Sequence, residues 1–380
     1  MNQKTAELST GDRVTTASDS RDGSNQELPQ IAQFLIAAGQ AAPSADNSQP
    51  WCFSWQDGEL ALYYCPDDAA AKVFGADRHS ERLTMGAVVE NIIQAANSAG
   101  LNADWNLTPD GPQYIRAAID PFAPVTDALR HHPVFNRHTN RLAYRSEPVP
   151  DQVLTNLSSL TEADCRLLII TDAQRIAEVA HLVELASRLR FRTREIHEWF
   201  GGVLRFSADE VATGTGLDVA TIDLPPGGRL LLRLIQDWQR LSLLNRLGFY
   251  KLLAKIESVK ATNAAAIVAI VGPRSAAAEF AAGRLMERAW ILLNSNEIAV
   301  QPFYVVTDLL RRLEANRTPP ELVNEARVLR HRLSSFLRDD NNVHMFLRAG
   351  LPMTEPIRSR RLPLEAACAT STPARTQRAS

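Results

Sequence analysis

The sequence predicts an α+β fold, in which two pseudo-symmetric half-domains with antiparallel-rich sheets are surrounded by helices. The chain has 380 residues, which at about 150 residues per domain corresponds to two packed units. Its strand-like segments come in pairs joined by tight turns, an arrangement typical of antiparallel sheets. Segments with helical periodicity separate these pairs, and the two halves share a loose order of helix, loop, sheet and helix.

The first half-domain is predicted to span residues 27–130. Apolar residues recur at helical spacing in its first segment, and Pro29 is compatible with the first turn of a helix. Two strand-like runs then meet at Asp57-Gly58, a dipeptide typical of hairpin turns. The predicted elements are a helix over 28–41, strands over 52–55 and 60–65, a helix over 85–99 ended by Gly100, and a hairpin of 104–107 with 114–119.

The second half-domain is predicted to span residues 131–365, after a crossing linker over 120–133 that is weakly periodic and contains Pro, Asp and His. Helices dominate it, and a helical insertion over 218–258 is a candidate lid. Ser275 is expected to cap a helix. The predicted elements are helices over 151–160, much of 173–204 and 229–258, and 275–296, with strands over 166–170, 264–271 and 343–347.

The composition indicates which partners and which cellular location to expect. Apolar residues make up 45% of the chain and charged residues 22%, as in ordinary globular proteins. The net charge of −2 gives no overall positive potential that would attract nucleic acid. No apolar run approaches the roughly 20 residues of a membrane span. We therefore expect neither nucleic acid nor membrane as a partner, and a cytoplasmic location.

The two termini and the four cysteines give further expectations. Residues 1–26 are polar and lack an apolar signal-peptide region, which predicts a disordered leader, and residues 366–380 predict a disordered tail. The four cysteines, Cys52, Cys65, Cys165 and Cys368, show no CxxC spacing. We interpret them as reduced and mostly buried.

The most unusual segment is residues 42–51, APSADNSQPW, a polar loop between an apolar helix and a strand. Such a loop can present backbone N–H groups, Asn47 and Gln49 to a planar polar ligand, while Trp51 anchors the next strand. An ordinary helix-to-strand turn has the same composition. On the residues alone, both interpretations stay open.

Arginines gather in two further segments. If residues 136–144 are extended, Arg137, Thr139 and Arg141 share one face and form an anion site, because guanidinium groups match phosphate oxygens. A solvated charged turn is the alternative. Arg360 and Arg361, with Arg358, could complete a phosphate pocket or belong to a solvated tail.

Other catalytic patterns are missing from the sequence. Gly214-Thr215-Gly216 lacks a third glycine at the dinucleotide-binding spacing, and no Walker lysine motif occurs. The histidines His131, His132 and His197 have no metal-ligand spacing, so we expect no metal. Ser44 does not lie in a GxSxG elbow, which argues against serine hydrolysis.

Taken together, residues 42–51 resemble the signature loop of FMN-dependent nitroreductases, and Arg137-His138-Thr139-Asn140-Arg141 resembles the Arg-x-Ser-x-Arg motif of that family. In ordinary members the Arg motif comes first and the loop follows, whereas here the order is reversed. The family's FMN lies between two subunits, one giving the Arg motif and the other the loop. The resemblance therefore implies a tandem fusion, a monomeric pseudo-dimer or a homodimer of it, with one complete flavin site.

The resemblance also implies roles for individual residues. Arg137 and Thr139 would contact the ribityl-phosphate portion, and Arg141 would approach flavin N1 and the C2 carbonyl, where a cation stabilises the reduced flavin. The backbone of Tyr304 and Val305 would lie near N5, although the family usually has glycine in place of Val305. The implied FMN-binding residues are Pro43, Ser44, Asn47, Gln49, Arg137, Thr139, Arg141, Pro302, Tyr304, Arg360 and Arg361.

The activity implied by the resemblance is that of an NAD(P)H oxidoreductase, in which bound FMN passes electrons to a nitroaromatic, a quinone or a pathway-specific acceptor. No catalytic side chain is required, because the flavin carries the hydride. The alternative is a protein that binds and sequesters FMN with little turnover, because a lid over 218–258 covers the ring.

Overall fold

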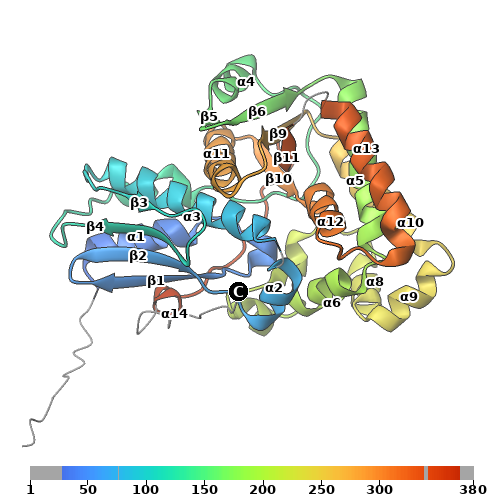
Figure 1. Ribbon diagram of the computed structural model, residues 1–380, viewed down its shortest axis with the longest axis horizontal. Coiled ribbons are helices and arrows are strands. Elements are labelled where there is room, and N and C mark those ends of the chain that lie inside the picture. Colours follow the sequence, from blue (N-terminus) through green and yellow to red (C-terminus); the bar gives the residue numbers. More distant parts are fainter. Residues whose placement is uncertain (1–27, 76, 338–340, 369–380) are drawn as a thin grey trace, which may run out of the picture.

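The computed structural model describes residues 28–75, 77–337 and 341–368, and these residues form an α+β fold with two antiparallel sheets (Figure 1). The predicted leader over 1–26 lies outside the described residues. None of the helices in the described ranges has the length and apolar character needed to cross a membrane.

A four-stranded sheet with the order β1-β2-β4-β3 forms the centre of the first half. The predicted hairpin is confirmed: Asp57 and Gly58 have φ angles of 53° and 78°, as a two-residue turn between twisted strands requires. The elements are α1 (Gln30–Gln40), β1 (Trp51–Gln56), β2 (Glu59–Tyr64), α2 (Asp68–Phe74), α3 (His79–Ser98), β3 (Asn106–Leu107) and β4 (Gln113–Ala118).

A five-stranded antiparallel sheet with the order β10-β11-β9-β6-β5 forms the centre of the second half. Ser275 caps α11 as predicted, since its hydroxyl accepts a hydrogen bond from the backbone N–H of Ala278. The elements are α4 (Asp151–Ser158), β5 (Thr161–Glu162), β6 (Cys165–Ile170), α5 (Ala173–Arg190), α6 (Arg194–Val203), β7 (Leu204–Arg205), α7 (Ala208–Ala212), β8 (Leu217–Asp218), α8 (Gly228–Ile235), α9 (Trp238–Asn245), α10 (Phe249–Thr262), β9 (Ala266–Gly272), α11 (Ala276–Ser295), β10 (Ala299–Phe303), α12 (Val305–Glu314), α13 (Val323–Leu337), β11 (Asn342–Gly350) and α14 (Leu364–Ala367).

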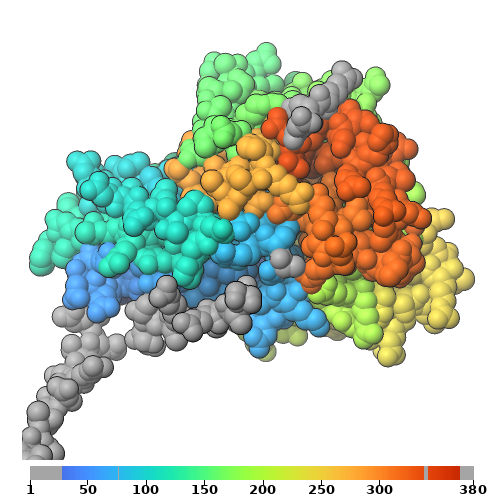
Figure 2. Space-filling model, viewed as in Figure 1, coloured from blue at the N-terminus to red at the C-terminus, as the bar shows by residue number. Residues whose placement is uncertain are grey.

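The two halves meet along α3 and α11, which pack against each other at a pair of glycines. A Cβ atom at Gly86 of α3 would overlap the carbonyl oxygen of Phe280, and one at Gly283 of α11 would overlap the carbonyl oxygen of Leu83. Only glycine permits this close backbone approach. In Figure 2 the orange surface of the second half directly abuts the blue and cyan surface of the first.

The hydrophobic core is continuous across this contact. Strand β9 is buried on both faces, so Val268 and Ile270 pack into one cluster while Ile267 and Val271 pack into another. The first cluster also contains Ile31 of α1 together with apolar side chains of α3 and α11. The halves therefore share their main core.

The C-terminal segment returns to the first half. Helix α14 packs against α1 and β1, and Cys368 forms a β-bridge with Phe53. Residues 366–368, which the sequence assigns to a disordered tail, are therefore ordered and pack on the first half. The remainder of that predicted tail, 369–380, lies outside the described residues.

Three expectations from the sequence are corrected. The helical stretch over 229–258 divides into α8, α9 and α10, with Asp237 and Gly248 as the N-caps of the second and third helices. The stretch over 173–204 likewise divides into α5 and α6. Cys52 and Cys65 are not reduced. Cys52 of β1 forms a disulfide with Cys65, the residue directly after β2, and their Cα atoms lie 5.8 Å apart, within reach of the bond.

Candidate functional site

A cavity of about 750 Å³ lies between the two halves, a volume typical of sites for small molecules and cofactors. Both motifs that the sequence singled out contribute residues to it, although more than 80 residues separate them. The predicted site residues that line it are Pro43, Ser44, Asn47, Arg137, Thr139, Arg141, Pro302, Tyr304, Val305 and Arg361. Gln49 and Arg360 are the two predicted residues that do not.

The loop that follows α1 is held in an unusual backbone conformation. Asp46, Asn47 and Gln49 have φ angles of 47°, 61° and 50°, in the left-handed region that side chains other than Asn and Asp rarely adopt. The Nδ2 of Asn47 donates to the carbonyl oxygens of Gly214 and Arg360, at 3.1 and 2.9 Å. These bonds fix the loop against two distant segments.

Gln49 has a positioning role in this loop. Its Nε2 donates to the carbonyl oxygen of Gly214 at 2.8 Å, and its Oε1 accepts from the backbone N–H of Leu362 at 3.0 Å. The side chain is only 4% exposed. Gln49 therefore holds the loop from behind the cavity, while the side chain of Arg360 is exposed at the surface.

Arg361 ties the C-terminal segment to the end of α1. Its guanidinium donates to the carbonyl oxygens of Gln40, Ala41 and Ala42, at 2.9 to 3.2 Å, and to Oδ1 of Asn47. Unsatisfied carbonyls at a helix C-terminus favour such a cation. Burial and the neighbouring charge of Arg137 lower the pKa of Arg361 to about 9.

Arg137 is also engaged within the protein. Its Nε lies 2.9 Å from Oε1 of Glu287, both side chains are buried, and its Nη2 donates to the carbonyl oxygen of Ala41 at 2.6 Å. The guanidinium lies over the ring of Trp290, 4.8 Å from its centroid. Burial raises the pKa of Glu287 to about 7, against the opposing effect of Arg137. The ionised form of Glu287 offsets the charge of Arg137 across this contact, and a pKa near 7 leaves part of the Glu287 population protonated at neutral pH.

Arg141 differs from both of these arginines. It lines the cavity, yet its guanidinium makes no hydrogen bond or ion pair with any residue that the structure describes. Burial lowers its pKa, with Asp46 acting in the opposite direction. A cation that is largely removed from water and has no partner costs free energy, which a bound anion or carbonyl oxygen would recover. Thr139 lines the cavity beside it.

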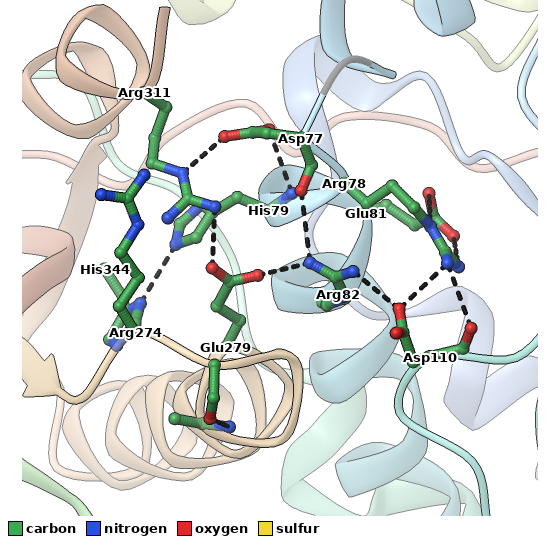
Figure 3. A network of polar contacts seen from close by, with 12 residues as sticks. Asp77, Arg78, His79, Glu81, Arg82, Asp110, Arg274, Glu279, Arg311 and His344 are labelled. Carbon is green, nitrogen blue, oxygen red and sulfur yellow. Dashed lines mark hydrogen bonds and ion pairs between the residues drawn. The ribbon is translucent and has the colours of Figure 1, made fainter. Parts of the chain in front are cut away.

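Sequence reasoning missed a polar network around His79, shown in Figure 3, which also reaches Tyr304. The hydroxyl of Tyr304 lies 2.8 Å from Nδ1 of His79, whose Nε2 lies 3.1 Å from Nδ1 of His344. Arg311 joins Asp77 and Glu279 around these rings. Tyr304, His79 and His344 lie far apart in the chain. No local sequence signal could therefore have predicted the network.

The helical segment over 218–262 forms one wall of the cavity. Leu232 and Ile235 of α8, and Leu253 and Ile256 of α10, line it with apolar side chains. Helix α6 adds Trp199, whose Nε1 donates to Oδ2 of Asp46 at 2.9 Å and so links the helical wall to the loop after α1. The cavity therefore combines an apolar wall with an arginine-rich side.

No family model matches the chain. The protein "Uncharacterized protein MT1398" of Mycobacterium tuberculosis is 26% identical over 287 residues, which cover 72% of this chain and 39% of that protein. The protein "Putative NAD(P)H nitroreductase acg" of Mycobacterium tuberculosis is 32% identical over 189 residues, which cover 47% of this chain and 56% of that protein. The chain thus spans between two fifths and somewhat over half of the length of these relatives.

A solved structure, the FMN-dependent nitroreductase NfnB from Mycobacterium smegmatis in complex with NADPH, aligns with 62% of this chain and 95% of that one. The sequence identity is 13% and the TM-score 0.37. Over 47% of its length, the chain is thus similar in sequence to a mycobacterial protein named as a putative NAD(P)H nitroreductase.

Proposed function

We propose that the cavity binds FMN and that the protein is a nitroreductase-type oxidoreductase, which uses NAD(P)H to reduce a nitroaromatic, a quinone or a pathway-specific acceptor. The observation that carries this proposal is Arg141, whose guanidinium forms no hydrogen bond or ion pair within the described residues and lines a cavity between both halves. The relative named as an NAD(P)H nitroreductase supports the same reaction class.

The residues present fit FMN. A flavin needs an apolar slot for its ring, donors for its pyrimidine oxygens and cations for its phosphate. The apolar wall supplies the first, Arg141 supplies the second, and Thr139 with the exposed Arg358 at the cavity would serve the phosphate. Pro43 and Ser44 would close the slot from the other half.

The structure also refines the roles that the resemblance implies. The side chains of three implied FMN-binding residues, Asn47, Gln49 and Arg361, form hydrogen bonds with one another and with the backbone. We therefore assign to them the role of holding the loop in place. Arg137 would add little net charge because Glu287 offsets it. Within the proposed site, Arg141 therefore provides most of the specific attraction for the ligand.

Bound FMN would supply the hydride chemistry, and the protein would supply binding, orientation and electrostatics. A positive charge at Arg141 would favour the reduced, anionic form of such a cofactor. The backbone around Tyr304 and Val305 lines the cavity and would face the reacting edge of the ring. No protein side chain is needed as a general base.

The test is a visible absorption spectrum of the purified protein, with extraction and identification of any yellow cofactor, before and after anaerobic addition of NADPH or NADH. Bound FMN that either nicotinamide bleaches is the expected result. A protein that carries no flavin and takes up none when FMN is added would contradict the proposal.

Arg141→Ala should weaken FMN binding about 10- to 100-fold, because a hydrogen bond to a charged group contributes about 1.5–3 kcal/mol. Fluorescence quenching of added FMN measures the dissociation constant. Arg145→Ala is the matched control, since Arg145 is exposed and lies outside the cavity lining. If the two variants bound FMN with equal affinity, Arg141 would not be a binding residue.

A second candidate function is FMN sequestration, favoured by the helical wall and by the bond that joins Trp199 to the loop after α1. Enclosure of this kind would keep nicotinamides from the ring. In that case the bound flavin would be bleached by dithionite and not by NADPH or NADH.

A further inference from the structure

Helices α8, α9 and α10 expose large apolar side chains that no part of the described chain covers. Leu230 is 75% exposed, Leu243 is 61% exposed and Leu247 is 87% exposed. Leu234, Leu252, Ile256 and Val259 are also exposed. Helix α9 contacts both of the others, and α8 and α9 lie at the lower right of Figure 1, where yellow atoms form the corner of Figure 2. Clusters of this kind mark interaction surfaces.

These side chains are arranged in stripes along the helices. Leu230 and Leu234 lie one turn apart on α8, while Leu252, Ile256 and Val259 follow the same spacing on α10. Basic residues lie beside each stripe. On α8 these are Arg229 and Arg233, on α9 and α10 they are Arg240, Lys251 and Lys255, and Arg246 directly follows α9; all of them are exposed. We call these three helices, with their leucine and basic stripes, the α8–α10 surface.

The charge of this surface differs from that of the chain. From Arg229 to Lys260 there are seven basic residues and two acidic ones, a net charge of +5 in a chain whose total is −2. Within the described residues, Arg240, Arg246 and Lys251 form no ion pair. Their charge is therefore available to a partner.

We propose that the α8–α10 surface docks onto an anionic phospholipid membrane. Exposed leucines next to arginines and lysines match the boundary between acyl chains and phosphate headgroups, where apolar side chains insert and basic ones meet the phosphates. Self-association through this surface would bring two charges of +5 together, which like-charge repulsion opposes. Such docking is peripheral, and it departs from the expectation that no membrane is a partner, which rested only on the lack of a long apolar run in the sequence. It does not depend on the proposed flavin.

The docking surface and the cavity share side chains. Leu231 and Ile256 are 37% and 43% exposed, and both also line the cavity. A molecule docked through α8–α10 would thus turn the apolar wall of its cavity toward the lipid.

The experiment is flotation of the full-length protein with vesicles of phosphatidylcholine alone or mixed with phosphatidylglycerol. We expect binding to the mixed vesicles that weakens as salt is added, because ionic attraction to the surface is screened. Arg240→Glu combined with Arg246→Glu should reduce binding at least tenfold, given about fivefold per basic residue at an anionic surface. Leu230→Ser combined with Leu247→Ser should also reduce it about tenfold or more.

Phe122→Ser and Arg130→Glu are the matched controls, since both residues are exposed and belong to the other half. They should bind vesicles as the unchanged protein does. Failure of the unchanged protein to float with the mixed vesicles would overturn the proposal. It would equally be overturned if the paired variants bound normally, or if the leucine pair converted a dimer to a monomer in gel filtration, which would identify a second copy as the occupant.

Discussion

Tyr304, His79 and His344 form a stacked and hydrogen-bonded group, with interplanar angles of 9° and 10° between neighbouring rings. Burial lowers the pKa of His79 well below its usual value, and the neighbouring His344 and Arg311 lower it further. Burial and Arg311 together lower the pKa of His344 to about 4. Both imidazoles are therefore neutral at pH 7.

This neutrality predicts a loss of stability in acid. An unfolded histidine takes up a proton near pH 6.5, while folded His344 does so near pH 4. The contribution of neutral His344 to the free energy of unfolding is therefore complete above pH 6.5 and declines as the pH falls toward 4. At pH 5 the loss from this residue is about 2 kcal/mol. The free energy of unfolding of His344→Gln, measured with urea at pH 7 and pH 5, should therefore fall less than that of the unchanged protein.

Comparison at both pH values separates this effect from the other buried groups. Glu287, whose pKa is raised, titrates with the opposite sign, but it does so in both proteins and cancels in the difference. His131→Gln, at an exposed position, is the control and should leave the acid loss unchanged. An equal loss in His344→Gln and the unchanged protein would refute the prediction.

At the scale of elements, the crossing of α3 and α11 depends on two glycines. Gly86→Ala would place a Cβ against the backbone of Phe280, which cannot yield as a side chain could. Overpacking of this kind costs about 1–3 kcal/mol, and the rigid backbone favours the upper part of that range. Urea unfolding measures the loss.

Gly202→Ala is the matched control, because Gly202 lies in α6 with nothing within 4 Å of an added Cβ. Alanine is the better helix former there, so this variant should be stabilised by about 0.5–1 kcal/mol. If Gly86→Ala unfolded at the same denaturant concentration as the unchanged protein, the close helix approach would not hold.

Local chemistry made part of the fold predictable. The Asp57-Gly58 turn, the Ser275 cap and the apolar strand β9 were found because turn, cap and burial signals lie within a few residues of one another. Strand β10 was missed as a strand because it contains Pro302, which a central strand would not tolerate. It lies at the edge of its sheet, where a missing N–H is harmless.

The candidate site was predictable only in its motifs. Residues 43–47 of the loop line the same cavity as Arg137, Thr139 and Arg141, but their assignment to FMN stays a prediction. Other contacts depend on which segments meet in space. These are the ion pair of Arg137 with Glu287, the hydrogen bonds from Arg361 to the end of α1, and the disulfide of Cys52 with Cys65. Nothing in the spacing of these residues along the chain specifies such contacts.

At the scale of the whole molecule, the shared core predicts a single cooperative unfolding transition. Ile31 in the first half and Trp290 in the second belong to one apolar cluster, so neither half keeps a complete core without the other. Circular dichroism and tryptophan fluorescence should give coincident urea transitions. A fragment of residues 27–130 should be unfolded in isolation, and two separate transitions would contradict the prediction.

The loop after α1 and Arg141 face one cavity from opposite halves of the same chain, with residues 360–368 folded back across the junction. In a site divided between two separate subunits, dilution dissociates the subunits and with them the ligand. Here the two sides are covalently connected, so occupancy is set by ligand concentration alone. Each molecule, however scarce the protein becomes, would keep a complete binding site.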